Sequence, residues 1–165
     1  MVTIDLITGF LGSGKTTFLK KYAEYLMDQG LHIGILENDF GAINVDMLML
    51  HELRGDQCEL EMIAGGCDAE SHRRRFRTKL ISMRMCGYDR VLVEPSGIYD
   101  VDEFFDVLRE DPLDQWYEIG NVIAILDARL ENNLSQQADY LLASEACQCR
   151  KSDPEPCGCS HQGTV

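Results

Sequence analysis

The sequence predicts an α/β fold in which a mostly parallel, doubly wound sheet forms the middle of three α/β/α layers. Two observations support this prediction. Short apolar segments alternate along the chain with longer segments of helical periodicity, which is the pattern of strands joined by crossover helices. Residues 90–93 and 121–126 are also largely apolar, as expected for strands that are buried on both faces of a sheet.

The first part of the chain begins this alternation. Residues 2–7 alternate and are rich in β-branched side chains, which indicates a strand. After a glycine-rich turn, residues 16–28 carry apolar side chains at helical spacing, and Gly30 is suited to end that helix. Residues 32–36 are a short apolar strand, which leads into a polar turn at 37–41.

The rest of the chain continues the pattern and then changes character. The predicted elements are a loop that can include a helical turn (44–56), a strand (58–63), a helix with a basic surface (71–86), a strand (90–93), a helix (101–109), a strand (121–126) and a helix (134–146). From residue 147 the chain has two Cys-x-Cys pairs and no apolar periodicity. We therefore predict one domain over residues 1–146 and a cysteine-rich tail over 147–165.

Composition limits the function classes. A chain of 165 residues that is 45% hydrophobic can bury a real core in one domain. The net charge of −13 argues against a nucleic-acid partner, because phosphate backbones require a basic face. No segment approaches the roughly 18 apolar residues of a membrane span, and the strand at the N-terminus leaves no room for a signal peptide. We expect a cytoplasmic protein that does not bind a membrane.

Residues 9–16 read Gly-Phe-Leu-Gly-Ser-Gly-Lys-Thr and fit the phosphate-loop pattern without a mismatch, between a predicted strand and helix. Glycines let backbone N–H groups converge on a β-phosphate, and the helix N-terminus adds partial positive charge. Lys15 is expected to span the β- and γ-phosphates, and the Thr16 hydroxyl to ligate Mg²⁺. The fold is therefore expected to be that of a P-loop NTPase, with nucleotide contacts from Gly9, Gly12, Ser13, Gly14, Lys15, Thr16, Thr17 and Gly97.

An acidic group is expected to approach the metal from a neighbouring strand. Glu94 follows the apolar residues 91–93 and is placed for this role, while the N–H of Gly97 can turn toward a γ-phosphate. A solvated strand cap is the alternative interpretation of Glu94. The phosphate loop favours the functional interpretation, so the predicted catalytic residues are Lys15, Thr16 and Glu94.

Four motifs together resemble the CobW/HypB/UreG nucleotide-binding domain of the metallochaperone GTPases, and its CobW-type members in particular. Residues 7–17 resemble the opening of that domain, and residues 64–67 resemble the start of its Gly-Gly-Cys-x-Cys-Cys metal motif. Residues 37–41, followed by Asn44 and Asp46, are similar to its switch I segment. Residues 94–97 are similar to its Glu-x-x-Gly switch II element. The likeness covers residues 1–146.

The resemblance implies slow GTP hydrolysis coupled to delivery of Zn²⁺, Ni²⁺ or Co²⁺ to a client protein, with ATP and a homodimer left open. The resemblance implies that Lys15 and Thr16 bind phosphate and Mg²⁺. It implies that three acids surround the magnesium and the switch: Glu37, Asp46 and Glu94. Cys67 would bind the client metal. Switch loops that relax on hydrolysis would alter a thiolate site joined to them. Two other functions remain open: a small P-loop kinase for a metabolite, and a module that binds nucleotide or metal without turnover.

The sequence departs from the family pattern at the metal motif. Where the family has Cys-x-Cys-Cys, this chain has Cys67-Asp68-Ala69-Glu70, so one of three thiolates remains. His72 follows, and Cys67, Glu70 and His72 are candidates for a mixed site, because zinc, nickel and cobalt accept all three ligand types. The alternative is that Cys67 is a buried small residue and His72 a helix-surface residue.

The second departure is that the guanine-reading motif expected after the helix at 134–146 is absent. The resemblance therefore implies an incomplete domain, either truncated or completed by a partner. The tail carries instead a cluster of soft or borderline ligands: Cys147, Cys149, Cys157, Cys159 and His161. The four thiolates can surround a Zn²⁺ or Cu(I) ion. A disordered tail with incidental cysteines is the alternative.

Acidic residues are concentrated where only Arg109 opposes them in the sequence: Asp100, Asp102, Glu103, Asp106, Glu110, Asp111, Asp114 and Glu118. One interpretation is a solvated helix face and loop. The other is a docking surface for a basic partner or a route for metal delivery. The sequence leaves both open.

Overall fold

The computed structural model describes residues 1–9, 12–39, 49–64, 69–95 and 101–126. Its centre is a sheet of five parallel strands in the order β3-β2-β4-β1-β5. The strands are β1 (Val2–Gly9), β2 (Ile33–Asp39), β3 (Cys58–Ala64), β4 (Arg90–Pro95) and β5 (Tyr117–Ile125). The predicted helix at 134–146 and the tail at 147–165 lie outside the described residues.

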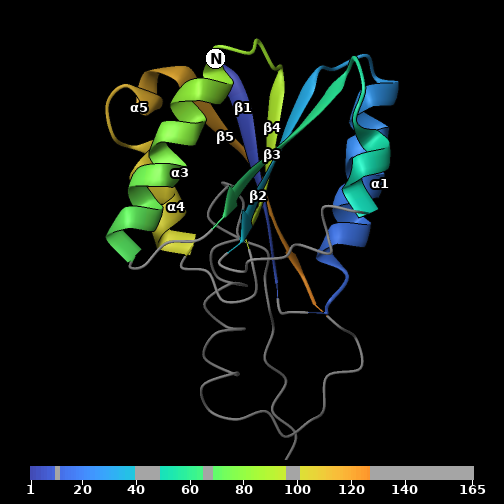
Figure 1. The fold of residues 1–165 in the computed structure, drawn as a ribbon, viewed down its shortest axis with the longest axis horizontal. Coiled ribbons are helices and arrows are strands. Elements are labelled where there is room, and N and C mark those ends of the chain that lie inside the picture. Colours follow the sequence, from blue (N-terminus) through green and yellow to red (C-terminus); the bar gives the residue numbers. More distant parts are fainter. Residues whose placement is uncertain (10–11, 40–48, 65–68, 96–100, 127–165) are drawn as a thin grey trace, which may run out of the picture.

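Helices cover both faces of the sheet, which confirms the predicted three layers (Figure 1). On one face lies α1 (Lys15–Asp28), and on the other lie α3 (Ala69–Arg84), α4 (Val101–Leu108) and the short α5 (Leu113–Trp116). A 3₁₀ turn, η1 (His51–Leu53), is the helical turn expected within 44–56. None of the helices in the described part of the chain combines the length and apolar character that a membrane crossing requires.

Each face of the sheet has its own hydrophobic cluster. Under α1, the buried side chains of Leu19 and Ala23 belong to one cluster with Ile35 of β2. On the other face, Phe76 of α3 and Phe104 of α4 are buried with their ring centroids 6.2 Å apart. Strands buried on both faces explain why the sequence shows apolar runs rather than strict alternation.

The predicted start of the last strand is wrong, because β5 begins at Tyr117 rather than at 121. A β-bulge explains why the sequence pattern did not show the first half of this strand. Ile4 pairs with Ile119 and Leu6 with Val122, so two residues of β5, including Gly120, oppose the single Asp5 of β1. A Cβ on Gly120 would lie 2.2 Å from Oδ1 of Asp5. The bulge thus allows glycine and polar residues within a strand, and its first half therefore lacks the continuous apolar pattern expected of a buried strand.

The strand order indicates that a ligand would bind at the carboxyl ends of β1 and β4. These strands are neighbours, but the chain leaves β1 toward β2 on one side and leaves β4 toward β5 on the other. In open α/β sheets ligands bind where the strand order reverses in this way. The phosphate loop follows β1, and Glu94 lies near the end of β4.

Candidate functional site

Glycines give the phosphate loop its shape. Gly9 ends β1 with φ of 138°, and a Cβ there would lie 2.2 Å from the carbonyl oxygen of Ile125 in β5. Gly12 and Gly14 have φ of 77° and 94°, in the left-handed region that glycine adopts without strain. Gly14 is the N-cap of α1, and its carbonyl accepts the N–H of Phe18 at 2.9 Å. The backbone of the loop therefore requires glycine at these positions.

The first turn of α1 carries the groups that would meet a phosphate. Lys15 and Thr16 are buried, and Thr17 is exposed. The hydroxyl oxygen of Ser13 is also buried and has no hydrogen-bond partner in the described part of the chain. The first turn contains no acidic residue that would offset the positive end of the helix dipole. Such a helix start attracts an anion.

A buried hydrogen bond joins α1 to the neighbouring strand. The hydroxyl of Thr16 donates to Oε1 of Glu94 at 2.9 Å, although 78 positions separate the two residues. Glu94 is only 4% exposed, at the carboxyl end of β4. The structure thus brings together two residues that the sequence assigned to one metal site.

Glu37 is the other predicted metal-site acid that the structure describes. It is also 4% exposed, and its Cα pairs with that of Glu94 in the register between β2 and β4. Paired positions of neighbouring strands direct their side chains to the same face. Two buried carboxylates at the carboxyl ends of neighbouring strands, one of them bonded to the Thr16 hydroxyl, form a site that favours bound cations.

This donor set has the chemistry that Mg²⁺ requires. Mg²⁺ is bound by oxygen and is typically held by one or two carboxylates together with waters and substrate phosphates. Within the described ranges no three His, Cys, Asp or Glu side chains gather closely enough to hold a metal alone. The oxygens of Thr16, Glu37 and Glu94 therefore fit a magnesium ion whose other ligands include phosphate oxygens of a bound nucleotide. Asp46 and Gly97 lie outside the described residues.

The predicted client-metal residues are only partly described. Glu70 is exposed in the first turn of α3, and Cys67 lies outside the described residues, as do Cys147, Cys149, Cys157 and Cys159. His72 is 1% exposed, so the interpretation of His72 as a helix-surface residue is wrong: it lies on the buried side of α3. Burial, with the nearby charge of Arg75, lowers the pKa of His72 and favours the neutral imidazole.

The acidic segment is opposed by more than Arg109. Glu110 accepts a 2.6 Å hydrogen bond from Arg73 of α3 and forms a 3.0 Å ion pair with Nε of Arg77. Arg77 also donates to the carbonyl of Asp111 at 2.8 Å. Packing of α3 against α4 thus brings arginines that are distant in sequence to this segment, in addition to Arg109.

Sequence reasoning missed a polar network centred on Asp5, which is fully buried in β1. Its carboxylate accepts hydrogen bonds from Asn121 N–H at 2.6 Å, from Arg90 at 2.8 Å and from Tyr22 at 2.8 Å. These contacts join β1 to β5, β4 and α1, the elements around the phosphate loop. The feature of the sequence that could have revealed this network is an aspartate inside an otherwise apolar strand.

Comparison with known proteins agrees with this geometry. The family model described as "CobW/HypB/UreG, nucleotide-binding domain" matches residues 3–151. The zinc chaperone YeiR of Escherichia coli is 31% identical over 159 residues, which are 93% of this chain and 47% of YeiR. The zinc chaperone YjiA of the same organism is 31% identical over 139 residues, 77% of this chain and 41% of YjiA. The chain thus spans less than half the length of these relatives.

Solved structures resemble the fold. The cell division protein FtsY of Thermotoga maritima superposes with a TM-score of 0.56 at 16% identity, over 92% of this chain and 50% of that one. The signal recognition particle receptor FtsY of Elizabethkingia anophelis, in complex with GDP, gives a TM-score of 0.56 at 17% identity, over 92% of this chain and 47% of its own. At such identities the likeness supports the fold alone.

Proposed function

The chain belongs to the CobW/HypB/UreG nucleotide-binding family, and from this premise we propose that it hydrolyses GTP and couples hydrolysis to the delivery of Zn²⁺ or a similar transition metal. The observation that carries the proposal is the buried 2.9 Å hydrogen bond between Thr16 and Glu94 beside the phosphate loop. The relatives named as zinc chaperones support the choice of metal. The preference for guanine rests on kinship with the family.

The residues of the site would divide the work on the nucleotide. The Lys15 ammonium and the backbone N–H groups of the loop would hold the β- and γ-phosphates in place. Thr16, Glu37 and Glu94, with Asp46, would hold Mg²⁺, which when bound neutralises charge on the phosphates. Glu94 would also help to orient the attacking water. Positioning and electrostatic stabilisation supply most of the catalysis in such a reaction.

The sheet order supports a coupling between nucleotide and client metal. β3, β2 and β4 are consecutive in the sheet, with Asp39 paired to Ala64 and Asn38 to Pro95. Cys67 follows β3 in sequence, and the two predicted switch segments begin in β2 and β4 and continue beyond these strands. Rearrangement of the switches on loss of the γ-phosphate would therefore reach the Cys67 segment through adjacent strand ends. Cys67, Glu70 and His72 would hold the client metal in one nucleotide state only.

A turnover assay tests the proposed hydrolysis. Phosphate release is measured with GTP and with ATP, with and without Zn²⁺, Ni²⁺ and Co²⁺, and Lys15→Ala serves as the inactive control. We expect Mg²⁺-dependent release from GTP that responds to one of the transition metals. Nucleotide binding without phosphate release would instead identify a binding module, and phosphate transfer to a small molecule would identify a kinase.

A zinc titration tests the metal sites separately. We propose that the tail thiolates act as a loading site that replaces the thiolates missing after Cys67. The chain with all four tail cysteines replaced by serine is titrated beside the unaltered chain. We expect a lower zinc stoichiometry for the serine variant. Equal stoichiometry would refute the loading site and leave Cys67 with its neighbours as the proposed metal ligands.

A further inference from the structure

A network of polar side chains on the α1 side of the sheet includes none of the groups that would meet the nucleotide. At its centre is Asp5, which is fully buried in β1. The Oδ2 atom of Asp5 accepts hydrogen bonds of 2.8 Å from both Arg90 of β4 and Tyr22 of α1. The Tyr22 hydroxyl in turn accepts hydrogen bonds from Arg90 at 2.9 Å and from the Asn121 amide of β5 at 3.0 Å. The network therefore connects three strands to the helix that follows the phosphate loop.

The other carboxylate oxygen of Asp5 binds the β-bulge of β5. Oδ1 accepts the backbone N–H of Asn121 at 2.6 Å. A bulge leaves one residue without a partner in the strand ladder, and buried backbone groups require one, so this bond satisfies a backbone group at the bulge. A Cβ on Gly120 would lie 2.2 Å from the same Oδ1 atom. The carboxylate can therefore occupy this position only because residue 120 is glycine.

The bulge determines which part of β5 meets the phosphate loop. Before the bulge Ile4 pairs with Ile119, whereas beyond it Gly9 pairs with Ile125, so the sequence separation of paired residues rises from 115 to 116. Gly9 is the residue at which β1 ends and the loop begins. A Cβ on Gly9 would lie 2.2 Å from the carbonyl oxygen of Ile125. The start of the phosphate loop thus packs against a carbonyl whose position depends on the bulge.

The helix after the phosphate loop is also attached to Asp5. α1 begins at Lys15, and Tyr22 lies about two turns further along it. The Tyr22 hydroxyl joins α1 to Asp5, and the Tyr22 ring stacks on Phe18, with ring centroids 5.8 Å apart. The N–H of Phe18 donates to the carbonyl of Gly14, the N-cap of α1. The same carboxylate therefore influences both elements that the phosphate loop connects.

We propose that Asp5 is a positioning residue for the nucleotide site, which holds the end of β1 and the start of α1 in the arrangement that binds phosphate. Asp5 lies four residues before Gly9, about 13 Å along the strand, so it would act through its contacts and not by touching the phosphates. The inference rests on the proposed function, because it assigns a further residue to the same site. Small displacements of positioned groups weaken binding and slow reactions strongly.

Nucleotide affinity tests the positioning role. Dissociation constants of N-methylanthraniloyl GDP and GTP are measured with Mg²⁺, at a temperature where circular dichroism shows each variant to be folded. Asp5→Ala removes both carboxylate oxygens, and we expect about tenfold weaker binding. The loss should be equal for GDP and GTP, because the loop holds phosphates that both nucleotides contain. Asp5→Asn keeps an oxygen that can accept the Asn121 N–H, so its affinity should stay within about threefold of the parent.

Gly120→Ala tests the same contact without altering Asp5. The added Cβ would displace the carboxylate, and we expect nucleotide binding to weaken about as much as in Asp5→Ala. In the double variant Asp5→Ala/Gly120→Ala the carboxylate is absent, so the second substitution should weaken binding by less than about twofold more. Gly120→Ala also decides the question if Asp5→Ala does not fold.

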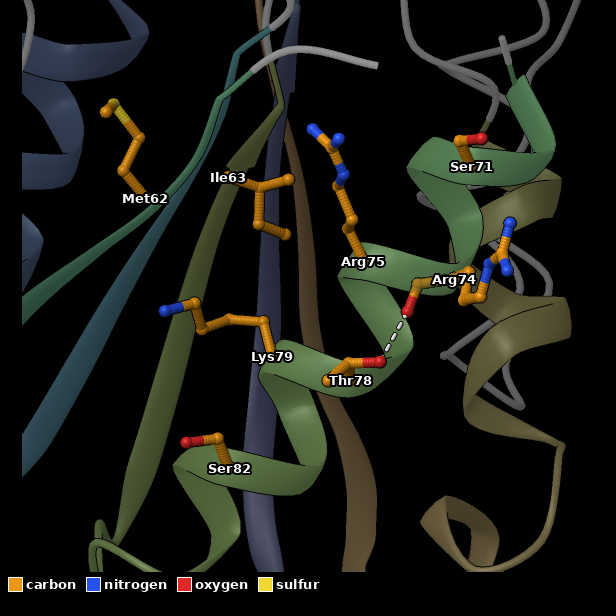
Figure 2. A pocket seen from close by; sticks show the side chains of 8 residues that line it. All are labelled: Met62, Ile63, Ser71, Arg74, Arg75, Thr78, Lys79 and Ser82. Carbon is orange, nitrogen blue, oxygen red and sulfur yellow. Dashed lines mark hydrogen bonds between the residues drawn. The ribbon is translucent and has the colours of Figure 1, made fainter. Parts of the chain in front are cut away.

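Lys79→Met is the matched control. Lys79 lines a cavity of about 700 Å³ between β3 and α3, where Figure 2 shows it among the other lining residues of α3. The 2.8 Å ion pair between Lys79 and Glu61 equals in length the pair between Arg90 and Asp5. Two strands separate β3 from β1, however, so this pair is remote from the phosphate loop. We expect Lys79→Met to change nucleotide affinity by less than about twofold.

Several results would overturn the inference. These are unchanged affinity in both Asp5→Ala and Gly120→Ala, a loss of the same size in Lys79→Met, a loss confined to GTP, or losses that multiply in the double variant. An unaltered chain that binds both nucleotides but releases no phosphate would refute the proposed hydrolysis, while the affinities of the variants would still decide the role of Asp5. If the unaltered chain bound neither nucleotide, both proposals would fail.

Discussion

The hydroxyl of Thr16 donates a hydrogen bond of 2.9 Å to Oε1 of Glu94, and it thereby fixes the first turn of α1 against the end of β4. Both residues are buried, and Glu37 of the next strand is paired in register with Glu94. A nucleotide phosphate held by the loop at 9–16 would therefore lie beside two carboxylates whose positions the sheet determines.

Replacement of Thr16 tests this arrangement. Thr16→Ala removes the hydroxyl that donates to Glu94 and that would bind Mg²⁺, and we expect GTP turnover to fall by about 100-fold, because a poorly held Mg²⁺ would neutralise the charge on the phosphates less well. Thr16→Ser keeps the hydroxyl and should retain most activity. Thr3→Ala is a matched control, since Thr3 donates a similar 2.8 Å bond to Glu118 at an exposed position. Equal activity of Thr16→Ala and the parent would contradict the assigned role.

The glycines of the phosphate loop should differ in their tolerance of alanine. A Cβ at Gly9 would lie 2.2 Å from a backbone oxygen, so we expect Gly9→Ala to lower the free energy of unfolding by about 3 kcal/mol. Gly12 has no atom within 4 Å of such a Cβ, so Gly12→Ala should cost about 1 kcal/mol for its positive φ alone. Urea unfolding of both variants measures the difference, and equal losses would refute the predicted close approach.

The carboxylate of Asp5 should contribute strongly to stability. Asp5→Asn removes the charge that the Arg90 guanidinium contacts at 2.8 Å, and we expect the free energy of unfolding to fall by about 3 kcal/mol. Lys20→Met is the control, because it removes a 2.6 Å ion pair with Glu52 on the surface and should change the unfolding midpoint little. Similar losses for both variants would mean that burial does not account for the contribution of the Asp5 network to the free energy of unfolding.

Alkaline pH should destabilise the fold partly through Tyr117, which is buried and donates a 2.8 Å hydrogen bond to the carbonyl of Leu80. Burial raises the pKa of Tyr117 above that of the unfolded chain, about 10. The folded state therefore favours the neutral phenol, and its stability is full below pH 10 and declines as pH rises further. Tyr117→Phe should cost about 1 kcal/mol at neutral pH but show a smaller decline between pH 9 and 11.

Unfolding free energies at several pH values measure this decline. Tyr25→Phe, at an exposed position, controls for the loss of one phenol from the chain. A decline of the same size in Tyr117→Phe and in the parent would contradict the assignment.

Cys58 and Cys86 should react with alkylating agents at very different rates. Burial, reinforced by Glu59, raises the pKa of the Cys58 thiol to about 11, so about one molecule in a thousand carries the thiolate at pH 8. Cys86 is exposed. We expect iodoacetamide to label Cys86 in the native protein and both cysteines in urea, as measured by peptide mass spectrometry. Rapid native labelling of Cys58 would show that β3 opens readily.

Local patterns predicted much of the fold. The phosphate loop is a contiguous motif, and strands buried on both faces appear as apolar runs, so β1, β4 and the elements between them could be located from the sequence. β5 could be located only in part. Its first half contains Glu118 and Gly120, whose presence is explained by the bulge opposite Asp5, a contact between residues far apart in sequence.

Other features depend on strand order, which the sequence does not specify locally. The basic surface of α3 was visible as a run of arginines, but which of them contact Glu110 follows from which elements flank the helix. The burial of His72 likewise depends on the side that α3 turns toward the sheet. The pairing of Glu37 with Glu94 required the knowledge that β2 and β4 are neighbours.

The pairing of Glu37 with Glu94 limits how the chain can change length during evolution. One residue inserted between Ile33 and Glu37 would turn the Glu37 carboxylate to the opposite face of the sheet, because side chains alternate along a strand. Insertions beyond Asp39 would leave the pair intact. Homologues should therefore vary in length after β2 and β4 but keep a fixed number of residues within them, and an alignment of their gaps would reveal the two acids without any structure.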